Sequence, residues 1–296
     1  MLGPTAAGKS AIAEQLARRI GAVIVSVDSM QVYRGMDIGT AKALPDVRQR
    51  IPHFMIDIAD PEHDYSVAEY QEAATRVVDR TLEKGVPVIV SGGSGLHFRS
   101  IVDPLSFPET DPETRGALEA AAPADLVSEL LDADPAAGAH VDLANPRRVL
   151  RAVEIHRLTG ETPTQRAADP RAVAVRSYEP VRPFTAVGVD PGGILAGRVA
   201  DRFDTMLDAG LVAEVHALEG RWGTTASQAV GYKQLLPVVR GERSLGAGRD
   251  LAVTATVGLA KRQRTFFRRD PRIHWLKWHH DLDARVDAAH AALGAD

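Results

Sequence analysis

The sequence contains no cysteine, and this absence excludes both disulfide bonds and thiolate metal sites. Long hydrophobic runs are also missing. The longest apolar stretches, such as residues 23–27 and 86–90, are far shorter than the roughly 20 residues that span a bilayer. The first residues lack the basic region, apolar run and cleavage site of a signal peptide. We therefore expect a cytoplasmic protein with no membrane segment.

An excess of positive charge is absent too, since 39 acidic residues outnumber 35 basic residues. This balance argues against a general nucleic-acid coat. Basic residues nevertheless gather in two places. Arginine is enriched in residues 142–182, and the stretch KRQRTFFRRDPR at 261–272 has one acid only, Asp270. Both stretches are candidate contacts to a phosphate backbone, and the alternative is that they are solvated helix faces.

The start of the chain, GPTAAGKS, matches the phosphate-binding pattern GxxxxGK[ST]. Glycines in this pattern let backbone N–H groups turn toward phosphate oxygens, Lys9 adds a positive charge, and the Ser10 hydroxyl is placed to hold Mg²⁺. A phosphorylated small molecule is therefore the expected ligand. The predicted phosphate-binding residues are Gly3, Pro4, Thr5, Ala6, Ala7, Gly8, Lys9 and Ser10.

Only two residues precede this loop, Met1 and Leu2. A loop of this kind normally follows a complete buried strand. We therefore expect the loop to be poorly held in this chain, and the sequence leaves open whether the chain is active.

Strand, loop and helix alternate in the first third of the chain, which is typical of a parallel sheet. The pattern predicts a helix that ends at Gly21, a strand at 23–27 and a strand at 86–90. Between the strands, Ser66 and Glu69 form a capping box at the start of another helix. Loops that follow parallel strands meet at one edge of the sheet, so we expect one site there.

The composition then becomes rich in alanine. The sequence predicts helices at 113–133 and 146–158 and an irregular stretch at 169–183. Strand patterns resume at 185–189 and at 274–277, with helices between them. The predicted fold class is α/β, a P-loop NTPase-like parallel sheet core with an inserted helical domain. The predicted segments are core residues 1–108, insertion residues 109–183 and core residues 184–296.

Asp28 follows the strand 23–27 directly. A carboxylate in this position, beside a phosphate-binding loop, is either associated with Mg²⁺ or acts as a general base. The alternative is an aspartate that caps the next turn.

Eight segments together resemble the tRNA dimethylallyltransferases, in the same order over nearly the whole chain. They are GPTAAGKS, VSVDSMQVYRGMDIGTAK, PHFMIDI, SGGSGLHF, NPRRVLRAVEI, GRVADRFDTML, AVGYKQL and LAKRQRTFF. The resemblance implies transfer of a dimethylallyl group from dimethylallyl diphosphate to N6 of the adenosine 3′ of the anticodon, in tRNAs that read codons beginning with U. It also implies that the helical insertion binds the tRNA anticodon arm.

The resemblance further implies roles for individual residues. Asp28 matches the general base and Arg198 an arginine on the diphosphate, which residues 3–10 would bind as the leaving group. Together with Ser10, whose hydroxyl the loop pattern places on Mg²⁺, these are the predicted catalytic residues. Family members usually have tyrosine where this chain has His97, which we interpret as a packing substitution. The implied tRNA contacts are Asp28, Ser29, Met30, Gln31, Ser94, Arg115, Arg147, Arg148, Val149, Leu150 and Arg151.

Two other functions remain open at this level. A small-molecule kinase also uses a phosphate-binding loop, and a related enzyme could prenylate free adenine nucleotides. The basic insertion favours a macromolecular acceptor over the latter. The sequence contains no NKxD motif, which argues against a GTPase, and it indicates no obligate partner, so we expect a monomer.

Overall fold

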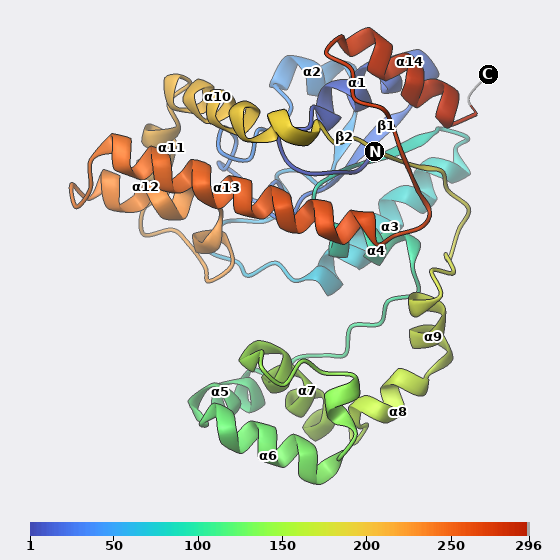
Figure 1. Ribbon diagram of the computed structural model, residues 1–296, viewed down its shortest axis with the longest axis vertical. Helices are drawn as coiled ribbons and strands as arrows, with labels where there is room; N and C mark the ends of the chain where they lie inside the picture. Colours follow the sequence, from blue (N-terminus) through green and yellow to red (C-terminus); the bar gives the residue numbers. More distant parts are fainter. Residues whose placement is uncertain (295–296) are drawn as a thin grey trace. The chain divides into compact units, whose positions relative to one another are not determined.

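The computed structural model describes residues 1–294 (Figure 1). All of its strand pairs are parallel within these residues. Three strands pair in the order β2-β1-β3, and β4 pairs with β5. Helices surround these strands, so the predicted α/β class, with a parallel sheet, is confirmed. The strands are β1 (Val23–Val27), β2 (His53–Phe54), β3 (Val88–Gly92), β4 (Ala186–Gly188) and β5 (Ile273–Trp275).

Leu2 joins the two groups of strands, because it bridges in parallel to both Gly92 and Gly188. Its N–H donates to the Val187 carbonyl at 2.9 Å, and its carbonyl accepts from the Val189 N–H at 2.9 Å. The Leu2 side chain is fully buried. The expectation of a poorly held loop was therefore wrong: Leu2 takes a strand position between β3 and β4, and the loop follows directly from it.

Helices α1 (Lys9–Ile20) and α14 (Leu282–Ala292) contact each other, and their buried residues form one hydrophobic core with the sheet. Helices α3 (Val67–Glu83) and α4 (Gly95–Val102) lie on the other side of the sheet (Figure 1). The predicted capping box of α3 is present, with Ser66 and Glu69 bonded reciprocally. The hydrophobic core that α1 and α14 form with the sheet contains Ile12, Leu16, Ile24, Ile89, Val187, Val286 and Ala289.

The remaining helices of this part follow β1 and β4. They are α2 (Pro45–Arg50), α10 (Leu195–Asp208), α11 (Leu211–Ala217), α12 (Tyr232–Val239) and α13 (Leu245–Arg268), with 3-10 turns at Gly192–Ile194 and Ala226–Gln228. Within residues 1–294 no helix is long and apolar enough to cross a membrane.

Prolines move two boundaries away from their predicted positions. The strand predicted at 86–90 begins two residues later, because Pro87 has no N–H and the Val86 N–H still bonds to the end of α3. The single helix predicted at 113–133 is two helices, because Pro123 starts a new helix and cannot continue the previous one.

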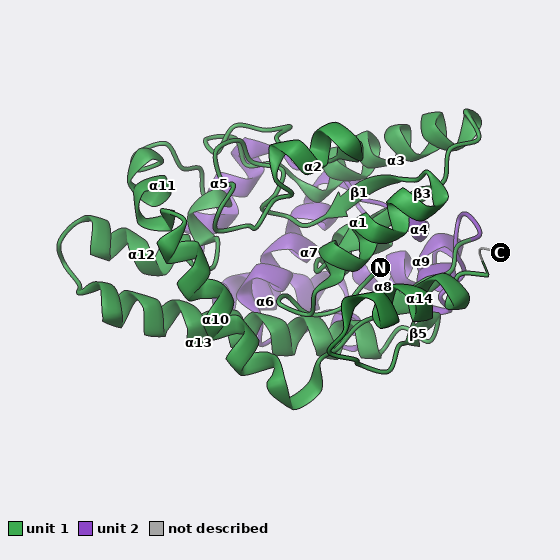
Figure 2. Cartoon of the chain, turned by 90° about the horizontal axis from the view of Figure 1, so that it is seen from above, with its two compact units in different colours: residues 1–101, 184–296 green, residues 102–183 purple. Residues whose placement is uncertain are grey.

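Contacts divide the described chain into two compact units, residues 1–101 with 184–296 and residues 102–183 (Figure 2). The second unit has its own hydrophobic core, which includes Leu118, Leu130 and Val153. Part of the stretch predicted to be irregular is helical, as α9. The helices of this unit are α5 (Pro112–Ala120), α6 (Pro123–Ala133), α7 (Pro146–Thr159), α8 (Pro163–Ala168) and α9 (Pro170–Arg176), with a 3-10 turn at Ala137–Ala139.

Candidate active site

The loop from Gly3 to Ser10 turns sharply at two glycines. Gly3 has φ +136°, and a Cβ there would lie 2.2 Å from the Val189 carbonyl oxygen, so only glycine fits. Gly8 has φ +84°, in the left-handed region that glycine adopts readily. Helix α1 begins at the next residue, and the N–H groups of its first turn have no acceptors within the helix. This arrangement favours an anion.

Two cationic side chains are held against the loop by its own carbonyl groups. Lys9 is buried, and its Nζ donates to the Pro4 carbonyl at 2.6 Å. Arg198, on α10, donates its Nε–H to the Ala6 carbonyl at 2.9 Å. Within residues 1–294, neither cation has a carboxylate partner at ion-pair distance. Their positive charge is therefore available to a bound anion.

A third cation, Arg202, lies one helical turn beyond Arg198 and donates to the Thr5 hydroxyl at 3.4 Å. Burial and the nearby Arg202 lower the pKa of Lys9 to about 7, although Asp28 acts in the opposite direction. Burial also lowers the pKa of Arg202. Both shifts mean that burial disfavours the positive charges beside the loop, which a bound anion would stabilise.

Asp28 lies at the end of β1, where its Oδ1 accepts the Met30 N–H at 2.9 Å. It borders a cavity whose polar side combines this carboxylate with Arg202 and with Gln263 from α13. The Gln263 Oε1 accepts the Thr5 N–H at 2.7 Å, and this bond ties the loop to α13. The remaining wall is largely apolar and includes Val199, Phe203, Met206, Val230 and Leu259.

Ser94 and His97 belong to the loop and helix that follow β3. The Ser94 N–H donates to the Val27 carbonyl at 2.9 Å, which joins this loop to the end of β1. The Ser94 hydroxyl is 2.7 Å from Nδ1 of His97, whose ring packs edge-on against Tyr70 with centroids 4.4 Å apart. Burial lowers the pKa of His97 to about 4, partly opposed by Asp28. The ring is therefore neutral at pH 7, and its contacts are those of a packing residue.

His97 predicts an acid-sensitive contribution to stability. The folded-state pKa is below the ordinary value of 6.5, so the unfolded chain takes up a proton first as the pH falls. The free energy of unfolding should then fall between pH 6.5 and 4, by about 2 kcal/mol between pH 6.5 and 5. Urea unfolding of the wild type and of His97→Phe at pH 7 and pH 5 measures this. Equal losses in the two proteins would contradict the prediction.

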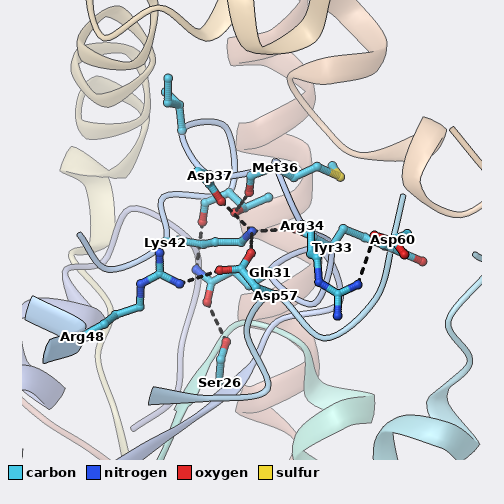
Figure 3. A network of polar contacts seen from close by, with 12 residues as sticks. Ser26, Gln31, Tyr33, Arg34, Met36, Asp37, Lys42, Arg48, Asp57 and Asp60 are labelled. Carbon is cyan, nitrogen blue, oxygen red and sulfur yellow. Dashed lines mark hydrogen bonds and ion pairs between the residues drawn. The ribbon is translucent and has the colours of Figure 1, made fainter. Parts of the chain in front are cut away.

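Gln31 is occupied by contacts within the protein (Figure 3). Its Nε2 donates to the Thr40 carbonyl at 2.9 Å, and its Oε1 accepts from the Ser26 hydroxyl at 2.7 Å. The side chain therefore links β1 to the segment around residue 40. Met30 and Thr40 both line the cavity, so Gln31 positions its wall.

The same segment is held by a buried ammonium group. Lys42 has a side chain that is 1% exposed, and its Nζ donates to the Tyr33 carbonyl at 2.6 Å and to Asp37 at 2.7 Å. It also donates to Asp57, which pairs in addition with Arg48 (Figure 3). These ion pairs with Lys42 and Arg48 outweigh desolvation and lower the pKa of Asp57.

Replacement of Lys42 by methionine should lower the free energy of unfolding by about 3–5 kcal/mol, because it leaves partly buried carboxylate groups without their cation. Arg34→Met is the matched control. It removes an exposed ion pair to Asp60, at 3.1 Å in the same segment, and should change stability by less than about 1 kcal/mol. Chemical denaturation of both variants measures the difference, and equal effects would contradict it.

In the second unit, two of the arginines predicted to contact tRNA share a buried partner. Glu154 is fully buried, and its Oε2 lies 3.3 Å from Arg115 and 2.7 Å from Arg151. Arg151 also donates to the carbonyl of Pro108. These two guanidinium groups therefore hold α5, α7 and the entering chain together.

The stretch 147–151 does not present all of its side chains to solvent. Val149 is 1% exposed in the core of the second unit and Leu150 packs against that core, because both lie on the inner face of α7. The Val149 side chain therefore faces the core and the Leu150 side chain is partly buried, and the contact of these two positions with tRNA stays a prediction. Arg147 and Arg148 lie on the exposed face of the helix.

Ser10, the predicted magnesium ligand, is exposed at the start of α1. Among residues 1–294 no three His, Asp or Glu side chains gather as a metal site. A single hydroxyl beside a loop that favours an anion nevertheless suits Mg²⁺, which is commonly held by few protein oxygens together with phosphate oxygens and water.

Sequence analysis did not single out Arg202 or Gln263 as site residues. Arg202 had a usable signal, because it stands four residues after Arg198 and so shares its helix face. Gln263 also had a signal, because it stands in LAKRQRTFF, one of the segments that carry the family resemblance, and a structural or tRNA-facing role was expected there. Its contact with Thr5 had none, since it joins residues 258 positions apart.

Known proteins similar to this chain share one activity in their names. The model of the IPP transferase family matches residues 31–270. The tRNA dimethylallyltransferase of Streptomyces avermitilis is 45% identical over 284 residues, which cover 93% of this chain and 88% of the relative. The tRNA dimethylallyltransferase of Streptomyces griseus is 44% identical over 301 residues, covering 99% and 93%.

Solved structures give the same result. The full-length tRNA isopentenylpyrophosphate transferase from Bacillus halodurans is 31% identical with a TM-score of 0.68, over 99% of this chain and 95% of that one. The corresponding enzyme from Staphylococcus epidermidis is 30% identical with a TM-score of 0.71, over 99% and 97%. A eukaryotic dimethylallyltransferase acting on tRNA, 22% identical over 96% and 76%, shares the fold with a TM-score of 0.77. The chain belongs to the IPP transferase family.

Proposed function

We propose that the protein transfers a dimethylallyl group from dimethylallyl diphosphate to N6 of the adenosine 3′ of the anticodon, in tRNAs that read codons beginning with U. The products are N6-(dimethylallyl)adenosine and diphosphate. We further propose a P-loop NTPase-like core, a requirement for Mg²⁺, and action as a monomer. The names of the relatives support the choice of tRNA as acceptor.

The observation that carries this proposal is the two-sided character of the cavity. One side has Arg202 beside the phosphate-binding loop, and the other is a wall that includes Val199, Phe203 and Leu259. A prenyl diphosphate has the same division, with two phosphates joined to a short branched hydrocarbon. The ribose and base of a nucleotide would leave their polar groups against this apolar wall, which makes a kinase a poorer fit.

The reaction places charge where the loop can stabilise it. N6 of the adenosine attacks C1 of the donor, the C1–O bond breaks, and its electron pair leaves on the diphosphate. Loop N–H groups together with Lys9, Arg198 and Arg202 donate to that leaving group. The Ser10 hydroxyl would hold Mg²⁺, which would supply further charge neutralisation to the diphosphate. Asp28 accepts the proton that N6 loses as the new N6–C1 bond forms.

The acceptor base must leave its stack to reach this cavity. Asp28 and Met30 line the cavity and Ser29 lies between them in sequence, so this segment is placed to contact the extruded adenosine. We assign Gln31 the role of holding the segment in place. Arg147 and Arg148, exposed on α7, are the proposed phosphate contacts of the second unit.

Incubation with labelled dimethylallyl diphosphate, Mg²⁺ and unmodified tRNA tests the proposal, with AMP and ATP as parallel acceptors. We expect label on tRNA, at the adenosine next to the anticodon. Label on AMP or ATP but not on tRNA would replace the proposal by prenylation of free nucleotides, and transfer of a phosphate group would replace it by a kinase.

A further inference from the structure

Arg285 is a buried cation on α14, beyond the residues that the family model matches. Its side chain is nearly covered, and the residue is 8% exposed. Two of its three nitrogens are used locally: Nε donates to the Asp281 carbonyl at 3.2 Å, and Nη2 donates to the His280 carbonyl at 3.5 Å. These bonds fix the guanidinium plane from the start of its own helix.

The third nitrogen, Nη1, lies against the phosphate-binding loop. A Cβ placed on Gly8 would be 2.7 Å from Nη1, so the absence of a side chain at Gly8 permits this approach. Nη1 is buried, and it has no hydrogen-bond partner among the described residues. A buried charged donor without an acceptor is strongly unfavourable.

Arg198 makes this position more unfavourable still. Its Nη2 lies 3.7 Å from the same point beside Gly8, and both guanidinium groups stack on Trp278, at 5.0 Å for Arg198 and 4.5 Å for Arg285. Burial and the charge of Arg198 lower the pKa of Arg285, opposed by Asp281. In residues 1–294 Arg285 has no carboxylate at ion-pair distance. Two cations are thus held together where the loop amides also favour an anion.

We propose that Arg285 is a further diphosphate-binding residue, which donates its Nη1–H to a phosphate oxygen bound at Gly8. This inference rests on the proposed function, because it extends the same anion site to the C-terminal helix. Arg198 and Arg285 then approach the bound diphosphate from α10 and α14, and Trp278 sets their orientation. The competing explanation is structural: Arg285 would serve only to hold α14 against Trp278.

Binding of inorganic pyrophosphate, measured by calorimetry with Mg²⁺, distinguishes the two explanations. Arg285→Met should bind about 10- to 100-fold more weakly than the wild type, because it loses a charge-assisted hydrogen bond. Arg285→Lys keeps the charge but loses the planar fork, so its affinity for pyrophosphate should lie between those of Arg285→Met and the wild type. Asp287→Asn is the control, since it breaks the ion pair between Arg19 of α1 and Asp287 of α14 and leaves the loop untouched. It should bind within twofold of the wild type.

Thermal unfolding gives the second measurement. Without pyrophosphate, Arg285→Met should melt no lower than Asp287→Asn, because it removes an unpaired buried charge. With pyrophosphate, its melting temperature should rise less than that of the wild type. Equal pyrophosphate affinity in Arg285→Met and wild type would overturn the proposal, as would an equal loss in Asp287→Asn. Failure of the wild type itself to bind pyrophosphate would overturn the proposed function as well.

Discussion

Replacement of Asp28 by asparagine should lower the rate of prenyl transfer by about two to four orders of magnitude, the range lost when a general base is removed. Asparagine keeps the size of the side chain and an oxygen that can accept the Met30 N–H. Only the ability to take a proton from N6 is lost. Single-turnover transfer from labelled dimethylallyl diphosphate to saturating tRNA measures the effect.

Donor binding separates this loss of chemistry from a loss of structure. Removing the Asp28 charge has two opposing effects on pyrophosphate: it takes away a repulsive carboxylate beside the cavity, and it lowers the pKa of Lys9, which Asp28 raises. Pyrophosphate binding should therefore change far less than the rate of transfer. Asp60→Asn makes the same chemical change at an exposed ion pair with Arg34 and should transfer at the wild-type rate. Wild-type turnover by Asp28→Asn would remove Asp28 from the role of base.

Elements with strong local signals were predictable from the sequence. The periodic apolar residues of α1, the glycine that ends it, and the capping box of α3 depend on contacts within a few residues, and all are present. The strand position of Leu2 was not predictable, because it depends on pairing with Gly92 and Gly188, far along the chain. Local patterns contain no information on such partners.

The candidate site also has a part that local sequence predicts and a part that depends on distant residues. The loop from Gly3 to Ser10 has a motif, whereas its supports come from distant helices. Glu214 of α11 is an example: its carboxylate accepts the N–H groups of Asp37, Ile38 and Gly39 at 2.8–3.1 Å, and so fixes a wall of the cavity. Glutamate on a helix surface has no pattern that predicts this role.

Replacement of Arg202 by methionine should lower kcat/KM for dimethylallyl diphosphate by about 10²- to 10³-fold, the loss typical of removing one charge-stabilising donor. Arg202 lies between the Thr5 hydroxyl and the cavity that Asp28 also lines. Methionine preserves much of the side-chain volume against the apolar wall. The KM for tRNA should change little, because the lost contact is to the donor. Steady-state kinetics with each substrate varied in turn measures both.

Stability should move in the opposite direction from activity. Arg202 lowers the pKa of Lys9, so removing it relieves repulsion between two cations and should leave the free protein at least as stable. Arg249→Met is the matched control. Arg249 of α13 pairs at 2.6 Å with Asp204, which lies on α10 together with Arg202, and removal of Arg249 should leave kcat/KM unchanged. A protein that lost stability and activity together on Arg202→Met would show that Arg202 is structural. If Arg202 binds the donor, its repulsion with Lys9 lowers the stability of the free protein, and the negative charge of the bound diphosphate offsets that repulsion.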